Sequence, residues 1–190
     1  MPVFLRAFPL YLLTTFIIEF IGGWRSDKGL TTVSLYNVFT TIEFVFYFWM
    51  LRYMIKNWFA KKVLLHSLWL YPILVTLNKL FLQKGPQFHT ITFSIGGGLI
   101  VMATITYFFE LFQLNKPVNL TREPPFWICS GLLFFYACTF PVYALINFFQ
   151  DPSSIIIKSI AFVFAVVNIL LYSSFIIASL CRIRIRKSFS

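Results

Sequence analysis

Two carboxylates lie in stretches of the sequence that are otherwise almost entirely apolar. Glu19 stands in TTFIIEFIGG and Glu43 in TTIEFVFYFW. A charged group at the centre of a membrane helix costs about 2.5 to 3.5 kcal/mol on insertion scales, so such groups usually face a partner or a water-filled cavity. Three outcomes stay open for these acids: pairing with Lys79 or His89, protonation to a neutral hydrogen-bond donor, or lining an outward pocket.

Other polar side chains fall at a similar depth in the apolar segments. They are Asn78, Lys79, His89, Asn147 and Asn168. Side chains of this kind serve as interhelical hydrogen-bonding groups in membrane bundles. They also mark binding sites and ion pathways. The sequence therefore leaves structural bonding, ligand binding or proton sensing, and ion or proton transport as alternatives.

The composition indicates the solvent around these residues. Of 190 residues, 59% are hydrophobic and 12% are charged, whereas about 25% are charged in ordinary soluble domains. Six continuously apolar stretches approach the length of about 20 residues that a helix needs to cross a bilayer, and the first is the shortest. They run over 8–23, 35–54, 63–82, 88–109, 126–149 and 155–181. We predict an all-α, polytopic transmembrane helical bundle of six spans that forms one membrane domain, 1–190.

The basic residues predict an orientation for the bundle. The net charge is +10, and most Lys and Arg residues fall in the connections on one side or in the tail, 182–190. Cytoplasmic loops collect positive charge, so we predict a bacterial inner-membrane protein with a cytoplasmic C-terminus. No basic stripe alternates with aromatic residues, so nucleic acid is not an expected partner.

Proline and glycine indicate helix geometry within the spans. Pro72 and Pro141 predict kinks in the third and fifth spans. Gly96, Gly97 and Gly98 lack the strand and the Lys-Ser/Thr pair of a phosphate loop, so we predict close helix packing there.

Catalytic and metal-binding signatures are absent from the sequence. It contains no HExxH, GxGD or GxSG motif, and its two histidines fall on opposite predicted sides. Its three cysteines form no CxxC pair. We expect neither an enzyme nor a bound cofactor or metal.

Three segments carry a resemblance to a known family. YNVFTTIEFVFYF, QFHTITFSIGGGLIVMATITYFFELF and PPFWICSGLLFFYACTFPVY resemble small, uncharacterised multi-helix inner-membrane proteins of Gram-negative bacteria. The resemblance implies six to seven transmembrane helices, the seventh preceding FPLYLLTTFIIEFIGGW, and an association with sensory or signalling systems. Acids matching Glu19, Glu43 and Glu110 and a histidine matching His89 recur in the family pattern. The chain would then lack that first helix, which leaves the side of its N-terminus open.

These observations predict a non-enzymatic membrane sensor or accessory signalling component. An outward pocket centred on Glu19, Glu43 and His89 would bind a small ligand or sense protonation. Its partners would be the lipid bilayer and a membrane or cytoplasmic signalling protein that meets the basic inner face. A small transporter or channel and a structural subunit of a membrane complex are the alternatives.

Overall fold

The computed structural model describes residues 3–83, 85, 87–114, 119–145 and 154–188. Within these residues the chain forms six α-helices and no strand, which confirms the predicted all-helical class. The helices are α1 (Val3–Asp27), α2 (Val33–Met54), α3 (Trp58–Leu77), α4 (Thr90–Phe112), α5 (Pro124–Leu145) and α6 (Ser154–Ser188). A π-helical turn, η1 (Asn78–Leu82), continues α3, and a 3-10 turn, η2 (Leu120–Arg122), precedes α5.

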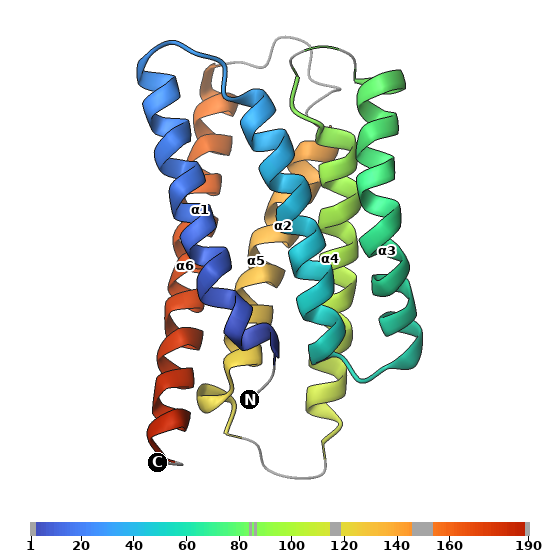
Figure 1. Cartoon of the computed structure of the whole chain (residues 1–190), viewed down its shortest axis with the longest axis vertical. Helices are drawn as coiled ribbons and strands as arrows, with labels where there is room; N and C mark the ends of the chain where they lie inside the picture. Colours follow the sequence, from blue (N-terminus) through green and yellow to red (C-terminus); the bar gives the residue numbers. More distant parts are fainter. Residues whose placement is uncertain (1–2, 84, 86, 115–118, 146–153, 189–190) are drawn as a thin grey trace.

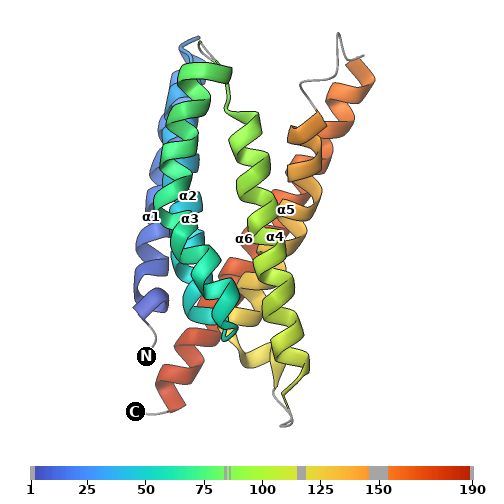
Figure 2. The ribbon, with the colours of Figure 1, turned by 90° about the vertical axis from the view of Figure 1, so that its right-hand side faces the viewer.

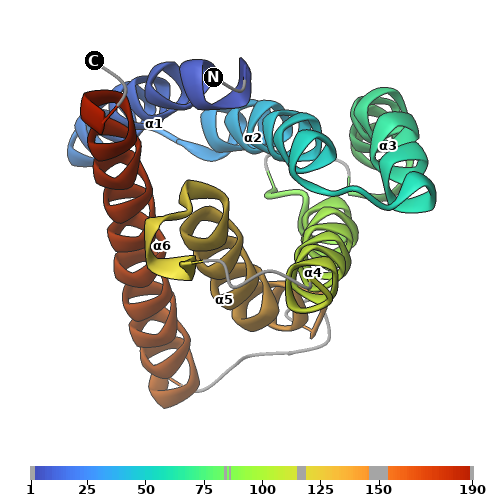
Figure 3. The same ribbon diagram turned by 90° about the horizontal axis from the view of Figure 1, so that it is seen from below.

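Successive helices run in opposite directions, so both described ends of the chain lie at the same end of the bundle (Figure 1). We call this the terminal end, and the end that holds the α1–α2 and α3–α4 connections the distal end. Helices α1, α2 and α3 form one layer, and α4 and α5 lie beside it (Figures 2 and 3). The long α6 crosses from the α5 side at the distal end toward α1 at the terminal end (Figure 2).

Five of the described helices are long and apolar enough to cross a membrane by length and composition. These spans are Arg6–Asp27, Trp58–Leu82, Thr90–Phe112, Pro124–Leu145 and Lys158–Cys181. The exception is α2, which has 22 residues but is too polar. The first span was expected to be the shortest, yet α1 has 25 residues. Asn37, Thr40 and several aromatic side chains of α2 are buried inside the bundle.

Local sequence explains where several helices begin and end. Gly29 has a φ of +68°, and Leu30 N–H donates to Arg25 O at 2.9 Å, as in a helix-terminating Schellman turn. Asn57 caps α3 by accepting from Ala60 N–H at 3.0 Å. Pro124 opens α5, where a missing N–H leaves no intrahelical bond unmade. The tail does not separate from the last helix, because α6 continues to Ser188.

The hydrophobic core extends along the bundle and includes fully buried side chains in its terminal half. Phe48 and Leu51 of α2 are fully buried, together with Ile128 and Leu132 of α5. The rings of Phe8 in α1 and Phe175 in α6 pack edge to face, with centroids 5.1 Å apart. This contact joins the first and last helices. Large side chains therefore close the terminal end.

A carboxylate fastens the same end of the bundle. Glu110, near the end of α4, accepts hydrogen bonds from the backbone N–H of Lys56 at 2.6 Å and of Asn57 at 2.5 Å. These two residues lie in the α2–α3 connection, residues 55–57. Glu110 thus ties the end of α4 to a connection more than 50 residues earlier in the chain.

The three consecutive glycines of α4 have different surroundings. A Cβ at Gly96 would lie 2.8 Å from Phe44 of α2 and 2.9 Å from Tyr71 of α3. A Cβ at Gly97 would lie 2.8 Å from Cβ of Phe140 in α5. Nothing lies within 4 Å of a Cβ at Gly98. Gly98 was predicted as a packing glycine, and this is wrong: successive helical residues are about 100° apart, so three in a row cannot all face neighbours.

Both predicted kink prolines lie inside helices. Pro72 is in α3 and Pro141 in α5, and the α3 ribbon changes direction along its length (Figure 2). The π-helical turn η1 follows Pro72 by less than two turns. Proline and π-turns are two of the few identifiable causes of helix bending. The α3–η1 segment is therefore the least regular part of the bundle.

Candidate functional site

A cavity of about 270 Å³ opens among the distal halves of α1, α2, α4, α5 and α6. We call it the acidic cavity because both predicted acids, Glu19 and Glu43, line it. Its other lining residues are Tyr36, Phe39, Thr40, Phe88, Phe93, Phe135, Thr139, Tyr143, Phe164, Asn168, Leu171 and Tyr172. Residues from the start and the end of the chain therefore share one chamber.

Glu43 is held at this cavity by two tyrosines. Tyr11 Oη–H donates to Glu43 Oε1 at 2.7 Å, and Tyr47 Oη–H donates to the same oxygen at 2.9 Å. The two hydroxyl oxygens are 2.5 Å apart. Both bonds go to Oε1, and no described residue donates a hydrogen bond to Oε2. One carboxylate oxygen is thus fixed while the other remains available.

Helical geometry and ring packing bring these groups together. Glu43 and Tyr47 are four residues apart on α2, so their side chains share a face. The ring of Tyr11 stacks on Phe46 of α2 with centroids 4.5 Å apart and an interplanar angle of 7°. The tyrosines are buried, whereas Glu43 is half-buried. The tyrosine pair therefore adjoins the core, and Glu43 stands where the core meets the cavity.

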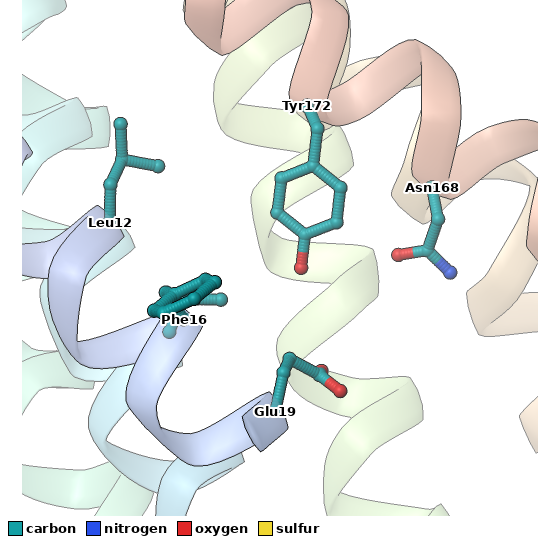
Figure 4. A pocket seen from close by; sticks show the side chains of 6 residues that line it. Leu12, Phe16, Glu19, Asn168 and Tyr172 are labelled. Carbon is teal, nitrogen blue, oxygen red and sulfur yellow. The ribbon is translucent and has the colours of Figure 1, made fainter. Parts of the chain in front are cut away.

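Glu19 is the more exposed of the two acids. It accepts a hydrogen bond from Tyr36 Oη–H at 3.2 Å. It also lines an adjoining cavity of about 510 Å³ that lies between α1 and α6. Figure 4 shows Glu19 on α1, with Tyr172 and Asn168 across from it on α6.

Asn168 connects the two chambers. It lines both of them, as do Glu19 and Tyr172. The Asn168 amide Nδ2 donates to Phe164 O, one turn earlier in α6, at 2.8 Å. This internal bond fixes the amide against its own helix and leaves its oxygen as a hydrogen-bond acceptor.

The wall opposite the acids is aromatic. The centroids of Phe93 and Tyr143 are 4.3 Å apart, and Tyr143 also contacts Phe164 at 5.3 Å. Phe88 joins this cluster at 5.3 Å from Tyr143. More than half of the lining residues of the acidic cavity are aromatic, and none of those described is Lys, Arg or His. The carboxylates therefore share this cavity with aromatic side chains and with no described basic residue.

His89 lines a different cavity from the acids. A chamber of about 260 Å³ between α2, α3 and the α3–α4 connection includes Asn37, Thr76, Lys79, Gln83 and His89. The sequence analysis grouped His89 with Glu19 and Glu43, and the structure separates them. On α2, Thr40 and Glu43 face the acidic cavity, whereas Asn37 and Thr41 face this second one. Helical periodicity accounts for the division, because these pairs lie on different faces.

Hydrogen bonds hold His89 firmly in place. Its ring Nε2 bonds with Asn37 O at 3.0 Å, and its ring Nδ1 lies 2.8 Å from Thr92 Oγ1. Asn37 Oδ1 accepts from His89 N–H at 3.2 Å, while Asn37 Nδ2 donates to Gln87 O at 2.9 Å. Asn37 therefore fastens α2 to the segment that leads into α4. His89 serves this connection and is buried.

The remaining predicted residues have separate positions. Asn78 is buried in η1 and donates from Nδ2 to Gln83 Oε1 at 2.8 Å, while its Oδ1 has no hydrogen-bond partner in the described structure. Lys79 is exposed beside the second cavity. Asn147 lies outside the described residues. Within the described chain no group of three or more His, Cys, Asp and Glu residues is placed to hold a metal.

Several other residues contribute to these sites. The position of Tyr47, one helical turn after Glu43, indicates in the sequence that the two side chains can meet. Asn37, like Asn78, is a polar residue in an apolar run, and such a residue indicates a hydrogen-bonding position inside the bundle. No pattern in the sequence indicates the role of Tyr11, since its contact with Glu43 depends on how α1 packs against α2.

No protein-family model matches the chain, and no curated protein and no solved structure matches it.

Proposed function

We propose that the chain is a polytopic inner-membrane protein that binds a small ligand in the acidic cavity and acts as a sensor or accessory signalling component rather than an enzyme. One observation carries the proposal. Glu19 and Glu43, from separate helices, line the same cavity, and Glu43 Oε2 takes no hydrogen bond from any described residue. Glu110, by contrast, uses both of its oxygens to fasten the α2–α3 connection.

The exterior of the bundle supports a lipid environment. Phe16, Phe20, Trp69, Phe109 and Phe162 are each more than 60% exposed and come from four helices. Soluble monomers rarely leave contiguous apolar patches of more than a few hundred Å². Together with the five long apolar helices, these side chains fit six helices surrounded by lipid.

The closed terminal end favours binding over passage. Beneath Glu43 lie Tyr11 and Tyr47, followed by fully buried Phe48 and Leu51. A transport path would have to cross these packed side chains to leave the cavity at the other end. We propose that the cavity opens to the periplasmic side, because Lys61 and Lys62, in the first turns of α3, lie at the terminal end.

The proposed output passes along the helices that meet at the cavity. Helix α6 carries Asn168 and Tyr172 at the cavity and Phe175 in the terminal core. A ligand that shifts α6 relative to α1 would change the Phe8–Phe175 contact. The basic terminal end can then present a different surface to anionic lipid or to a signalling partner.

Reconstitution distinguishes the proposed sensor from its alternatives. The purified protein in lipid nanodiscs is screened by thermal unfolding against small cations, neutral molecules and anions, and the same compounds are tested for flux in sealed vesicles. A sensor is stabilised by a ligand without flux, and the effect weakens in Glu43→Gln. Flux that depends on Glu43 would instead indicate a transporter. The absence of both stabilisation and flux, with co-purification of a membrane protein, would indicate a structural subunit.

A further inference from the structure

We propose that the acidic cavity is selective for a small organic cation, such as a quaternary or alkylated ammonium ion. This inference rests on the proposed function, since it requires that the cavity takes a ligand. It adds the chemical class of that ligand. Three features of the site carry it: its two acids without a basic partner, its aromatic wall and the fixed geometry of Glu43.

The charge of the cavity lacks a counter-charge from the protein. Glu19 and Glu43 line it, whereas no described Lys, Arg or His does so. The nearest candidates from the sequence, Lys79 and His89, line the second cavity instead. An acid in a low-dielectric site is stabilised in its charged form by a nearby opposite charge. A bound cation would supply the charge that the described side chains do not.

The aromatic wall determines which kind of cation fits. Tyr143 packs against Phe93 and Phe164 with centroids 4.3 and 5.3 Å apart. Ring faces attract cations through their quadrupole and are the usual walls of quaternary ammonium sites. The phenyl rings of Phe93 and Phe164 offer no oxygen ligand to a metal ion, so this wall favours a cation that gains from contact with ring carbon. An organic cation is more weakly hydrated and also gains from apolar contact with the rings.

Glu43 is prepared for such a ligand before it binds. Tyr11 and Tyr47 fix its Oε1 at 2.7 and 2.9 Å. The side chain therefore loses little conformational freedom on binding. Its Oε2, which accepts no hydrogen bond from the described residues, is available to a positive group. Glu19 and Asn168, shared with the adjoining cavity, can contact a longer substituent.

Three probes of almost the same shape test the charge preference. Choline is the cation, tert-butylethanol is its neutral analogue with carbon in place of nitrogen, and the anion of tert-butylacetic acid carries the opposite charge. Binding to the full-length protein in nanodiscs of neutral lipid is measured by calorimetry and by thermal unfolding. We expect choline to bind at least about tenfold more tightly than the alcohol, and the anion more weakly still.

Paired variants locate this preference in the cavity. Glu43→Gln keeps the size of the side chain and should weaken choline binding at least about tenfold, whereas Glu43→Asp, which keeps the charge, should retain part of it. Glu123→Gln makes the same chemical change at an exposed acid that does not line the cavity and should leave binding unchanged. Tyr143→Leu should lower affinity for choline more than for the alcohol. Unfolding curves show which variants remain folded.

Two results would overturn the inference, and they differ in their effect on the proposed function. If the alcohol or the anion binds as tightly as choline, the cation preference is wrong and the ligand-binding function stands. The same conclusion follows if Glu43→Gln leaves the affinity for choline unchanged. If no probe of any charge binds the folded wild-type protein, both proposals fail.

Discussion

Glu43 shows how a single acidic residue is accommodated in an apolar helix. Two tyrosine hydroxyls donate to one of its oxygens, and the cavity adjoins the rest of the side chain. Hydrogen bonds to charged acceptors are stronger than those between neutral groups. The tyrosine pair therefore reduces the cost of keeping an acid at this depth.

The contribution of this pair can be measured with Tyr47→Phe. The variant removes the hydroxyl that bonds to Glu43 and to Tyr11, so it should lower the free energy of unfolding by about 1 to 3 kcal/mol. Tyr53→Phe is the control on the same helix, because Tyr53 is exposed and should change stability by less than about 0.5 kcal/mol. Denaturant titration in mixed micelles measures both. Equal losses would show that the Tyr47 hydroxyl contributes nothing specific.

His89 predicts a pH dependence of stability. It lies just before the α4 span, and burial lowers the pKa of its imidazole, with an added effect from Lys79. The unfolded chain takes up this proton near the ordinary value of about 6.5, whereas the folded protein takes it up only at lower pH. The unfolded state therefore binds more protons in this window, and the free energy of unfolding should fall as pH decreases below about 6.5.

Unfolding measured from neutral to mildly acidic pH checks this sign. His89→Asn should remove most of the decrease, although it also lowers stability at neutral pH by breaking the bonds to Asn37 and Thr92. His66→Asn changes the exposed histidine of α3 and should keep the decrease. If the free energy of unfolding of the two variants changes with pH to the same extent, the pH dependence does not come from His89.

The sequence predicts the role of some of these residues but not of others. A charge inside an apolar run is a strong signal, because lipid offers it no partner, and this signal identified Glu19 and Glu43. It did not distinguish the faces of α2, so His89 was grouped with acids that line another cavity. The contact of Tyr11 with Glu43 depends on the packing of α1 against α2, which no pattern within either segment specifies.

At the scale of helices, the three consecutive glycines of α4 differ in how much space an added methyl group would have. Gly97→Ala would place a methyl group 2.8 Å from Phe140 Cβ, an atom fixed by the α5 backbone. The free energy of unfolding should fall by about 1 to 3 kcal/mol. Gly98→Ala meets no atom within 4 Å and should be neutral or stabilising by up to about 1 kcal/mol, because alanine favours helix.

The same unfolding assay compares these variants. Gly96→Ala should be intermediate, since the ring atoms of Phe44 and Tyr71 that it approaches can shift more easily than a Cβ. From most to least stable, the variants should rank Gly98→Ala, Gly96→Ala and Gly97→Ala. A loss in Gly98→Ala as large as that in Gly97→Ala would contradict the packing described for α4.

The existence and number of helices followed from the sequence, whereas their detailed ends did not. Long apolar runs require helices in lipid, because every backbone polar group must be paired within the segment. Helix α1 extends to Val3 and Asp27, beyond the apolar stretch 8–23, because its C-terminal end is set by the turn at Gly29 and not by a fall in hydropathy. The apolar run 35–54 predicts a span like the others, yet α2 is the one described α-helix that does not qualify as a candidate membrane span by length and composition.

At the scale of the molecule, the two ends of the bundle differ. The terminal end is filled by large side chains and fastened by Glu110. The distal half contains the acidic cavity and its two neighbours. This asymmetry could not be derived from hydropathy, because apolar residues are frequent in both halves. It arises from which side chains meet when six helices pack.

Cysteine accessibility tests the asymmetry and the proposed orientation most directly. Glu19→Cys, Glu43→Cys and Tyr47→Cys are made in a background without the native cysteines and treated in intact cells with a membrane-impermeant thiol reagent from the periplasmic side. The account predicts that Glu19→Cys reacts rapidly and Glu43→Cys more slowly, while Tyr47→Cys, at a position that is 0% exposed, is protected. Protection at both position 19 and position 43 in folded protein, or reaction only from the cytoplasmic side, would contradict it.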